Sequence, residues 1–151
     1  MILYKNDPLR SGSKDQERAK ELLLQECYTL VLCRGDITHT DTRRGIRPLL
    51  DLWEQGTTVQ GFSAADKVVG KAAAFLYALL QMGSVHAQVI SQPALDLLIQ
   101  AGIPVTYETL VPAIKNRTNT GFCPMETAVW DAADPQDALC RIQDTLQTLS
   151  T

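Results

Sequence analysis

Hydrophobic and polar positions follow a helical spacing near the start of the chain and a strand spacing after it. Residues 14–26 carry alanine and leucine side chains on one stripe, which predicts an amphipathic helix. Residues 28–33 form a continuous apolar and β-branched run, and the turn sequence at 34–36 leads into a second run at 37–40. The pattern predicts a helix followed by a β-hairpin.

Beyond the hairpin the pattern alternates between helices and strands. We expect a helix from Pro48 to Gly56, a strand at 58–62, a helix that begins at Ala65 or Asp66 and ends at Met82, a strand at 85–90, a helix at 93–100 and a strand at 104–107. This succession implies a parallel sheet with right-handed crossovers, in which the long apolar helix lies buried at the centre. Pro124 opens a short helix, and Asp134-Pro135 opens the last one.

The length and charge of the chain restrict what it can be. Its 151 residues fit one domain, which we place at residues 14–151 behind a flexible N-terminal segment, residues 1–13. The net charge of −3 argues against binding of duplex nucleic acid, because a phosphate backbone calls for a broad basic face. The longest apolar run, residues 72–80, is far shorter than the ~20 residues that span a bilayer, and residues 1–13 have no signal-like apolar core. We therefore expect a cytoplasmic protein without membrane contacts.

Cysteine and histidine side chains form no metal motif. The four cysteines form neither a Cys-x-x-Cys pair nor a zinc-ribbon spacing. We expect Cys27, Cys33 and Cys140 to be free thiols in the core, because their neighbours are apolar. His39 and His86 stand alone in strand-like contexts, and we interpret both as structural. No metal site and no cofactor are predicted.

Two lysines stand where an α/β sheet collects its ligands, beyond the carboxyl end of a strand. With a helix starting at Asp66, Lys67 and Lys71 lie four residues apart on one helical face, near the helix end that disfavours cations. A bound anion would turn both penalties into attractions. The alternative is that one lysine reaches solvent while the other pairs with Asp66 or another carboxylate. Gly70 suits either hypothesis, since it lets a ligand or a neighbouring backbone approach closely.

Three arginines form a second cationic group before the helix at Pro48: Arg43, Arg44 and Arg47. If the two helix starts converge, these side chains strengthen the case for an anion site. A solvated arginine loop is the alternative. A polar loop that contains Lys115, Asn116 and Arg117 could close such a pocket.

Cys123 precedes Pro124 at a helix start, where the helix dipole stabilises a thiolate, so it is the thiol best suited to reaction. Glu126 lies three residues on and could cap the helix or accept a proton. The alternative is a plain cap beside a buried thiol. Asp66, Cys123 and Glu126 are the candidate catalytic residues if a reaction occurs.

Several of these segments resemble one known family. The segments are residues 66–72 (DKVVGKA), 90–95 (ISQPAL), 110–112 (LVP) and 123–126 (CPME). They occur in the same order as in an uncharacterised prokaryotic family, the domain of unknown function numbered 1893, which is grouped with the cytidine-deaminase-like superfamily. The resemblance covers roughly residues 28–146. It implies a three-layer α/β/α domain with a five-stranded mixed sheet, in which the first hairpin supplies the antiparallel strand.

Working deaminases of that superfamily hold zinc through a His or Cys followed two residues on by Glu at one helix start, and through Pro-Cys-x-x-Cys at the next. The resemblance places residues 43–47 at the first position and residues 65–68 at the second. Neither segment contains a thiolate or an imidazole, and their cations repel a divalent metal. The sequence therefore indicates that the chain is not a zinc-dependent deaminase, and it leaves open whether the chain is an enzyme.

Together these observations predict a site for a small anionic metabolite, such as a nucleotide or another phosphorylated compound. The expected ligand-binding residues are Lys67, Gly70, Lys71, Arg43, Arg44, Arg47 and Asn116. The alternative, from a different class, is a catalytically silent binding or assembly module that works as a homodimer.

Overall fold

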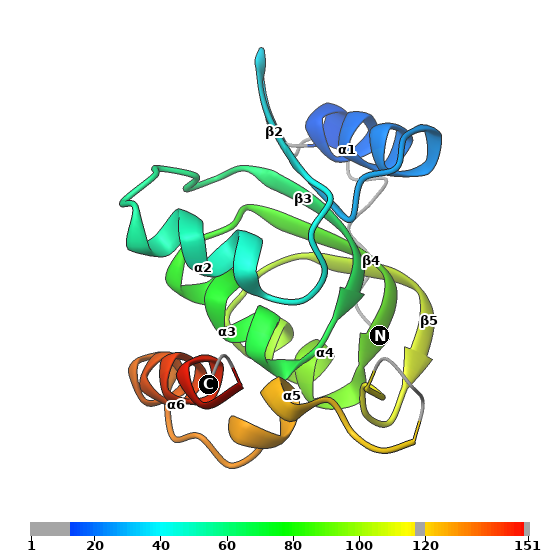
Figure 1. Ribbon diagram of the computed structural model, residues 1–151. Helices are drawn as coiled ribbons and strands as arrows, with labels where there is room; N and C mark the ends of the chain where they lie inside the picture. The colour runs from blue at the N-terminus through cyan, green and yellow to red at the C-terminus, as the bar shows by residue number, and fades with distance from the viewer. Residues whose placement is uncertain (1–12, 117–119, 150–151) are drawn as a thin grey trace.

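The computed structural model describes residues 13–116 and 120–149, and five strands in this part of the chain form one mixed sheet (Figure 1). The strands are β1 (Leu30–Arg34), β2 (Ile37–Asp41), β3 (Ser63–Val69), β4 (Ser84–Ser91) and β5 (Val105–Val111), in the spatial order β2-β1-β3-β4-β5. β1 is antiparallel to both of its neighbours, whereas β3, β4 and β5 run parallel. The predicted mixed sheet is confirmed, and the hairpin does supply its antiparallel strand.

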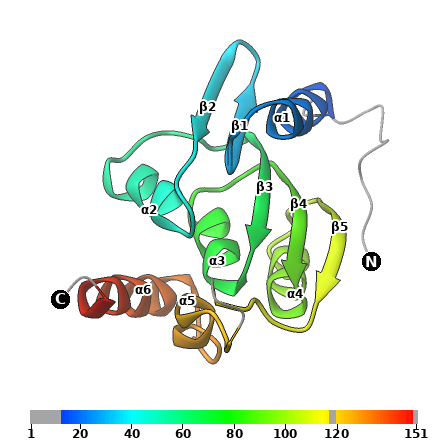
Figure 2. The same ribbon diagram turned by 45° about the vertical axis from the view of Figure 1, so that its right-hand side comes forward.

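Helices cover both faces of the sheet. They are α1 (Ser13–Gln25), α2 (Arg47–Glu54), α3 (Lys71–Leu79), α4 (Gln92–Gln100), α5 (Pro124–Ala128) and α6 (Pro135–Leu149). α1 packs on β1 and β3 from one side, while α2, α3 and α4 occupy the other side (Figure 2). α5 and α6 pack against α3. This arrangement agrees with the predicted three-layer α/β fold.

Two groups of buried side chains hold these layers together. The main core lies between the sheet and α3, whose Tyr77 and Leu76 have no exposed surface. A smaller core between α1 and the sheet contains Leu23, Val31 and Cys33. Burial of each such aliphatic side chain contributes about 1.5–3 kcal/mol, so the large α3 core is the main source of stability.

The segment before α3 differs from the sequence prediction. The predicted strand at 58–62 is a loop, and residues 63–69, expected to begin the central helix, form β3. The alanines at 64 and 65 look helical in sequence, but both are fully buried because helices pack on the two faces of this strand. Small side chains let those helices approach, so tertiary packing overrides local propensity here. Gly70 ends the strand, and the helix starts at Lys71.

The cysteines only partly follow expectation. Cys33 is buried as predicted, but Cys27 and Cys140 are exposed rather than in the core. Cys140 lies on α6, and an apolar neighbourhood in sequence does not decide which face of an amphipathic helix a residue occupies. Among the described residues, no helix is both long and apolar enough to cross a membrane.

Candidate functional site

The two lysines of the predicted anion site do not share a helical face. Lys67 lies in β3 and is exposed, whereas Lys71 is the first residue of α3 and Gly70 is its N-cap. Asp66 also belongs to β3, so it does not cap the helix as expected. The helix therefore begins later than the sequence predicts, with Lys71-Ala72-Ala73 in its first turn.

The N-terminus of α3 is occupied by a carboxylate of the protein itself. Glu126 is 2% exposed, and its Oε2 accepts hydrogen bonds from the Lys71 backbone N–H at 2.6 Å and from the Ser91 hydroxyl at 2.5 Å. Its Oε1 accepts from the Ile114 N–H at 2.7 Å. We call these four residues the Glu126 junction. It joins α5 to α3, to the N-cap of α4 and to the segment after β5. The negative charge that the helix end attracts is therefore supplied internally.

Gly70 fits this junction through its lack of a side chain. A Cβ at this position would lie 3.1 Å from Glu126 Oε2 and 3.2 Å from Ile114 Cγ1. Glycine thus lets the buried carboxylate approach the start of α3. Of the two sequence hypotheses for Gly70, the structure favours approach of a neighbouring segment.

Lys71 and Cys123 are also engaged by nearby parts of the chain. The Lys71 ammonium donates a hydrogen bond to the Trp130 carbonyl and lies 5.9 Å from the centroid of the Phe75 ring. Cys123 is half-buried at the N-cap of the five-residue helix α5, and its N–H donates to the Ile114 carbonyl. Lys71 therefore links α3 to the C-terminal region, and Cys123 links α5 to the segment after β5.

A second carboxyl group, that of the half-buried Asp66, has fewer hydrogen-bond donors. The Asp66 Oδ2 accepts a hydrogen bond from the Tyr77 hydroxyl at 2.5 Å, and its Oδ1 accepts a longer one from the Val68 N–H at 3.3 Å. Burial raises the pKa of Asp66 to about 7, against the lowering effect of those hydrogen bonds. Burial, together with the neighbouring Asp66 charge, also raises the pKa of Tyr77 well above its ordinary value. Asp66 can consequently hold or release a proton near neutral pH.

The arginine group is ordered by two aspartates. Arg43 donates to Asp41 and to Asp51, each at 2.8 Å, and these contacts raise the Arg43 pKa and lower that of Asp41. Arg47 lies 3.9 Å from Asp51. Arg44 is exposed and has no ion-pair or hydrogen-bond partner among the described residues. Only Arg43 is therefore neutralised by short contacts.

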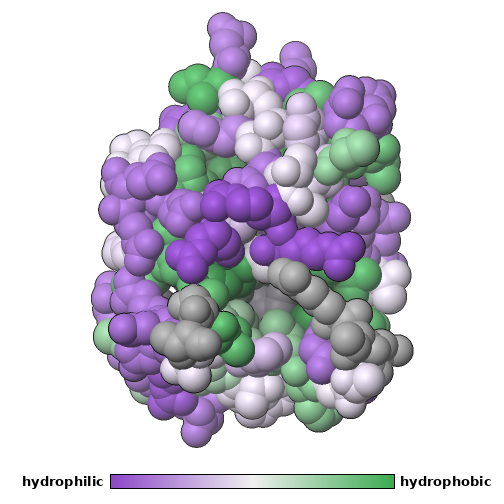
Figure 3. Space-filling view, viewed as in Figure 1, coloured by the Kyte–Doolittle hydropathy of each residue, from purple (hydrophilic) through white to green (hydrophobic). Residues whose placement is uncertain are grey.

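Thr29 brings the arginine group next to β3. Its hydroxyl donates to the Arg43 carbonyl at 2.7 Å, and its own carbonyl accepts from the Lys67 N–H at 3.1 Å. The Lys67 side chain, like that of Arg44, is exposed and has no hydrogen-bond or ion-pair partner in the described part of the chain. The adjoining N-terminus of α2 has neither a side-chain cap nor an acidic residue in its first turn. Figure 3 shows strongly hydrophilic side chains gathered in the middle of this face, above a hollow.

The polar loop after β5 is organised by its own contacts. Asn116 Oδ1 accepts from the Thr120 N–H at 3.0 Å, and the Asn116 N–H donates to the Gly121 carbonyl. The Lys115 ammonium lies 4.9 Å from the centroid of the Phe122 ring. Arg117 lies outside the described residues. Asn116 thus shapes the loop that was expected to close the pocket.

Comparison with known proteins places the chain in a family. A model of the domain of unknown function DUF1893, also named TM1506, matches residues 18–146. The chain belongs to the DUF1893 family. The crystal structure of a DUF1893 family protein (TM1506) from Thermotoga maritima is similar over 92% of each chain, with 25% sequence identity and a TM-score of 0.81. No curated protein matches. The family membership therefore supports the fold without naming a substrate.

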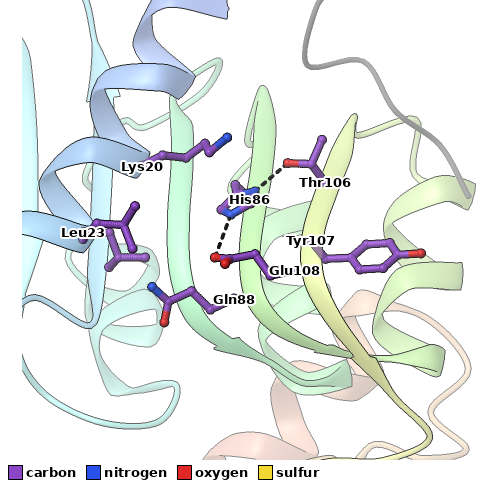
Figure 4. Close-up of a pocket in the computed structure, with 8 residues that line it drawn as sticks. Lys20, Leu23, His86, Gln88, Thr106, Tyr107 and Glu108 are labelled. Atoms are coloured by element: carbon purple, nitrogen blue, oxygen red, sulfur yellow. Dashed lines mark hydrogen bonds and ion pairs between the residues drawn. The ribbon is translucent and has the colours of Figure 1, made fainter.

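Sequence reasoning missed one further polar cluster of this DUF1893 chain, on the α1 side of the sheet (Figure 4). His86 of β4 is 6% exposed; its Nδ1 lies 2.7 Å from the Thr106 hydroxyl and its Nε2 lies 3.5 Å from a Glu108 carboxylate oxygen. Burial lowers the His86 pKa, and the nearby Lys20 charge lowers it further, while Glu108 opposes both effects. Thr106 and Glu108 alternate along one strand, a spacing that puts both on one face and could have revealed the cluster.

Proposed function

We propose that this DUF1893 domain binds a small anionic metabolite at the carboxyl end of β3. Arg44, Arg47 and Lys67 supply the positive charges for the ligand. The observation that supports this most is that Arg44 and Lys67 have no partners in the described chain, although Thr29 holds their backbone segments together. A positive charge without a counter-ion gains energy from a bound anion.

The neighbourhood of these cations favours an anion in a second way. The backbone N–H groups at the start of α2 have no side-chain cap, and this helix end attracts negative charge. In contrast, the first N–H groups of α3 and α4 already donate hydrogen bonds to the Glu126 carboxylate and to the Ser91 hydroxyl, respectively. The proposal accordingly moves the anion from the Lys71 region, where the sequence suggested it, to the α2 side of β3.

Asp66 is the residue proposed to move a proton if the ligand reacts. Its side chain lies on the face of β3 that α3 covers, where Tyr77 holds it, and its pKa of about 7 suits proton exchange near neutral pH. Glu126 is less suited to the reaction, because its oxygens already accept three hydrogen bonds from the chain. Cys123, at the N-cap of α5, stays a candidate for covalent chemistry. A phosphorylated or nucleotide-like compound remains the proposed ligand class. The link to nucleotides rests on the proposed kinship with cytidine-deaminase-like folds, which the order of helices and strands supports.

Thermal-shift and calorimetric titrations with inorganic phosphate, a nucleoside monophosphate and a sugar phosphate test this function. A ligand at a hundred times its dissociation constant adds about 2.7 kcal/mol of stability. Arg44→Ala and Lys67→Ala should each weaken binding by roughly tenfold, the usual effect of losing one charge-assisted contact. Lys14→Ala, on exposed α1 surface, is the matched control and should bind like the wild type. No stabilisation of the wild type by any of these anions would contradict the proposal.

The second candidate function is a non-catalytic assembly module. The observation that favours it is exposed aromatic surface near the C-terminal region, where Phe122 is 62% and Trp130 is 49% exposed. A homodimer in solution that Trp130→Ala dissociates, together with no response to the anion panel, would favour this function over metabolite binding.

A further inference from the structure

The face of the sheet that α1 covers contains a cavity beside that helix. α1 packs mainly on β1 and β3, so it leaves part of β4 and β5 open, and a cavity of about 310 Å³ lies between them. Its lining includes Lys20, Leu23, His86, Gln88, Thr106 and Glu108. Figure 4 shows Lys20 reaching from α1 over the sheet, with His86 and Glu108 on adjacent strands. The volume is near the lower end of the roughly 300–1,000 Å³ typical of ligand pockets, which suits a small metabolite.

Opposite charges line this cavity without neutralising each other. The nearest carboxylate to Lys20 is Glu17 at 3.8 Å, one turn away on the same helix, and the Lys20 side chain is 25% exposed. Within residues 13–116 and 120–149, the Glu108 carboxylate contacts His86 at 3.5 Å and no other basic side chain, and it is 56% exposed. The structure records no ion pair between Lys20 and Glu108 among the described residues. A cation on the α1 wall therefore faces the cavity together with an anion on the β5 wall.

The base of the cavity is polar and fixed in orientation. The Thr106 hydroxyl holds the buried His86 ring through Nδ1, so Nε2 is directed toward Glu108. Because its pKa is lowered, His86 is neutral at neutral pH and does not compete with Lys20 as a cation. Gln88 adds an amide, and Leu23 and Leu24 supply an apolar wall on α1. Such a set offers one site for a negative group, one for a positive group and one for hydrocarbon.

We infer that this cavity binds an amino acid, with the ligand carboxylate at Lys20 and the ligand ammonium at Glu108. The ligand side chain lies against Leu23 and Leu24, and Gln88 hydrogen-bonds to its polar atoms. A zwitterion complements both charges at once. A simple anion would be repelled by the Glu108 carboxylate, and a simple amine would be repelled by the Lys20 ammonium. The residues that line the cavity include neither Arg44, Arg47 nor Lys67, so this inference does not rest on the anion site proposed above.

Ligand chemistry provides the primary test. In calorimetry and ligand-observed NMR with the full chain, leucine and glutamine should bind at millimolar concentration. Leucinamide, which lacks the carboxylate, and N-acetylleucine, which lacks the ammonium, should each bind roughly tenfold more weakly. γ-Aminobutyrate, with its charges farther apart, distinguishes an α-amino acid site from one for longer zwitterions.

Two variants assign the groups. Lys20→Gln should remove the preference for leucine over leucinamide, and Glu108→Gln should remove the preference over N-acetylleucine. Glu21→Gln, on the exposed face of α1, is the matched control and should keep both preferences. Arg44→Ala should also keep them, which separates this site from the anion site. The inference is overturned if the wild type binds no zwitterion, or if it binds leucinamide and N-acetylleucine as tightly as leucine.

Discussion

Glu126 and Asp66 both lie near the carboxyl end of β3, the first fully buried and the second half-buried, and the protein surrounds them differently. Glu126 accepts hydrogen bonds from two backbone N–H groups and a serine hydroxyl, contributed by three separate parts of the fold. Asp66 has one short hydrogen bond, from Tyr77, and a pKa raised to about 7. A carboxylate whose acceptor capacity is used by the chain has a structural role. One left short of donors is free to exchange protons.

The same contrast applies to the cations. Arg43 and Lys71 are held by internal acceptors, while Arg44 and Lys67 are not. Buried polar groups in folded proteins are almost always paired, and exposed charges at a sheet end are the groups that remain available to a ligand. The comparison therefore indicates that the polar groups around the start of α3 have a structural role. The cations near the start of α2 and at Lys67 remain available to a ligand.

Removal of the Glu126 carboxylate should produce the largest effect. Glu126→Ala leaves the Lys71 and Ile114 N–H groups and the Ser91 hydroxyl without an acceptor in a buried site. Since each unmet buried donor costs about 1–3 kcal/mol, we expect the three together to lower the free energy of unfolding by at least about 3 kcal/mol, measured by urea denaturation. Glu21→Ala on exposed α1 is the control and should change stability by less than about 0.5 kcal/mol. A loss below about 1 kcal/mol for Glu126→Ala would mean that the junction is not structural.

Asp66 should give the next largest effect, and it depends on pH. Its folded pKa of about 7 lies above the unfolded value near 3.8, so the folded state binds more protons between these values. The stabilising contribution is complete below about pH 4 and is lost as pH rises through about 7. At about 1.4 kcal/mol per pKa unit the loss is at most about 4 kcal/mol, and less because Asp66 keeps some contact with solvent.

Two variants isolate that pH dependence in urea titrations. Asp66→Asn cannot ionise, so its stability should lack the decline between pH 4 and 7 that the wild type shows. Tyr77→Phe removes a hydrogen bond that favours the charged carboxylate, and it should move the decline to higher pH. If the wild type and Asp66→Asn show the same pH profile, the contrast between the two carboxyl groups is wrong.

Local patterns in the sequence predict most of the fold. The hairpin follows from two β-branched runs around Gly35, which adopts φ 58°, and α4 follows from Pro93 and the glycine at 102. The failure at residues 58–70 has a physical cause. A strand that is covered by helices on both faces needs small side chains, which Ala64 and Ala65 provide. Because alanine also favours helices, the sequence pattern predicts a helix at these positions.

The site was predicted less well, because its geometry depends on contacts between distant residues. Sequence reasoning selected Lys71 and Glu126 separately, but their hydrogen bond joins positions 55 apart in the chain. No pattern in the sequence around Glu126 indicates that its carboxylate would bind the N-terminus of α3, where the sequence predicts an anionic ligand. The Asp66–Tyr77 pair and the His86 cavity also arise only when strands and helices assemble.

The smallest effect concerns the unpaired cations in the ligand-free protein. Arg44→Gln and Lys67→Gln remove charges that have no partner, so each should raise the free energy of unfolding by a few tenths of a kcal/mol at low salt. Arg43→Gln breaks contacts to two aspartates and should instead lower it by about 1 kcal/mol. Both differences should shrink at about 1 M salt, where charges are screened beyond about 3 Å. If Lys67→Gln destabilises the protein as Arg43→Gln does, Lys67 already has a counter-ion, and an incoming anion would have to displace it.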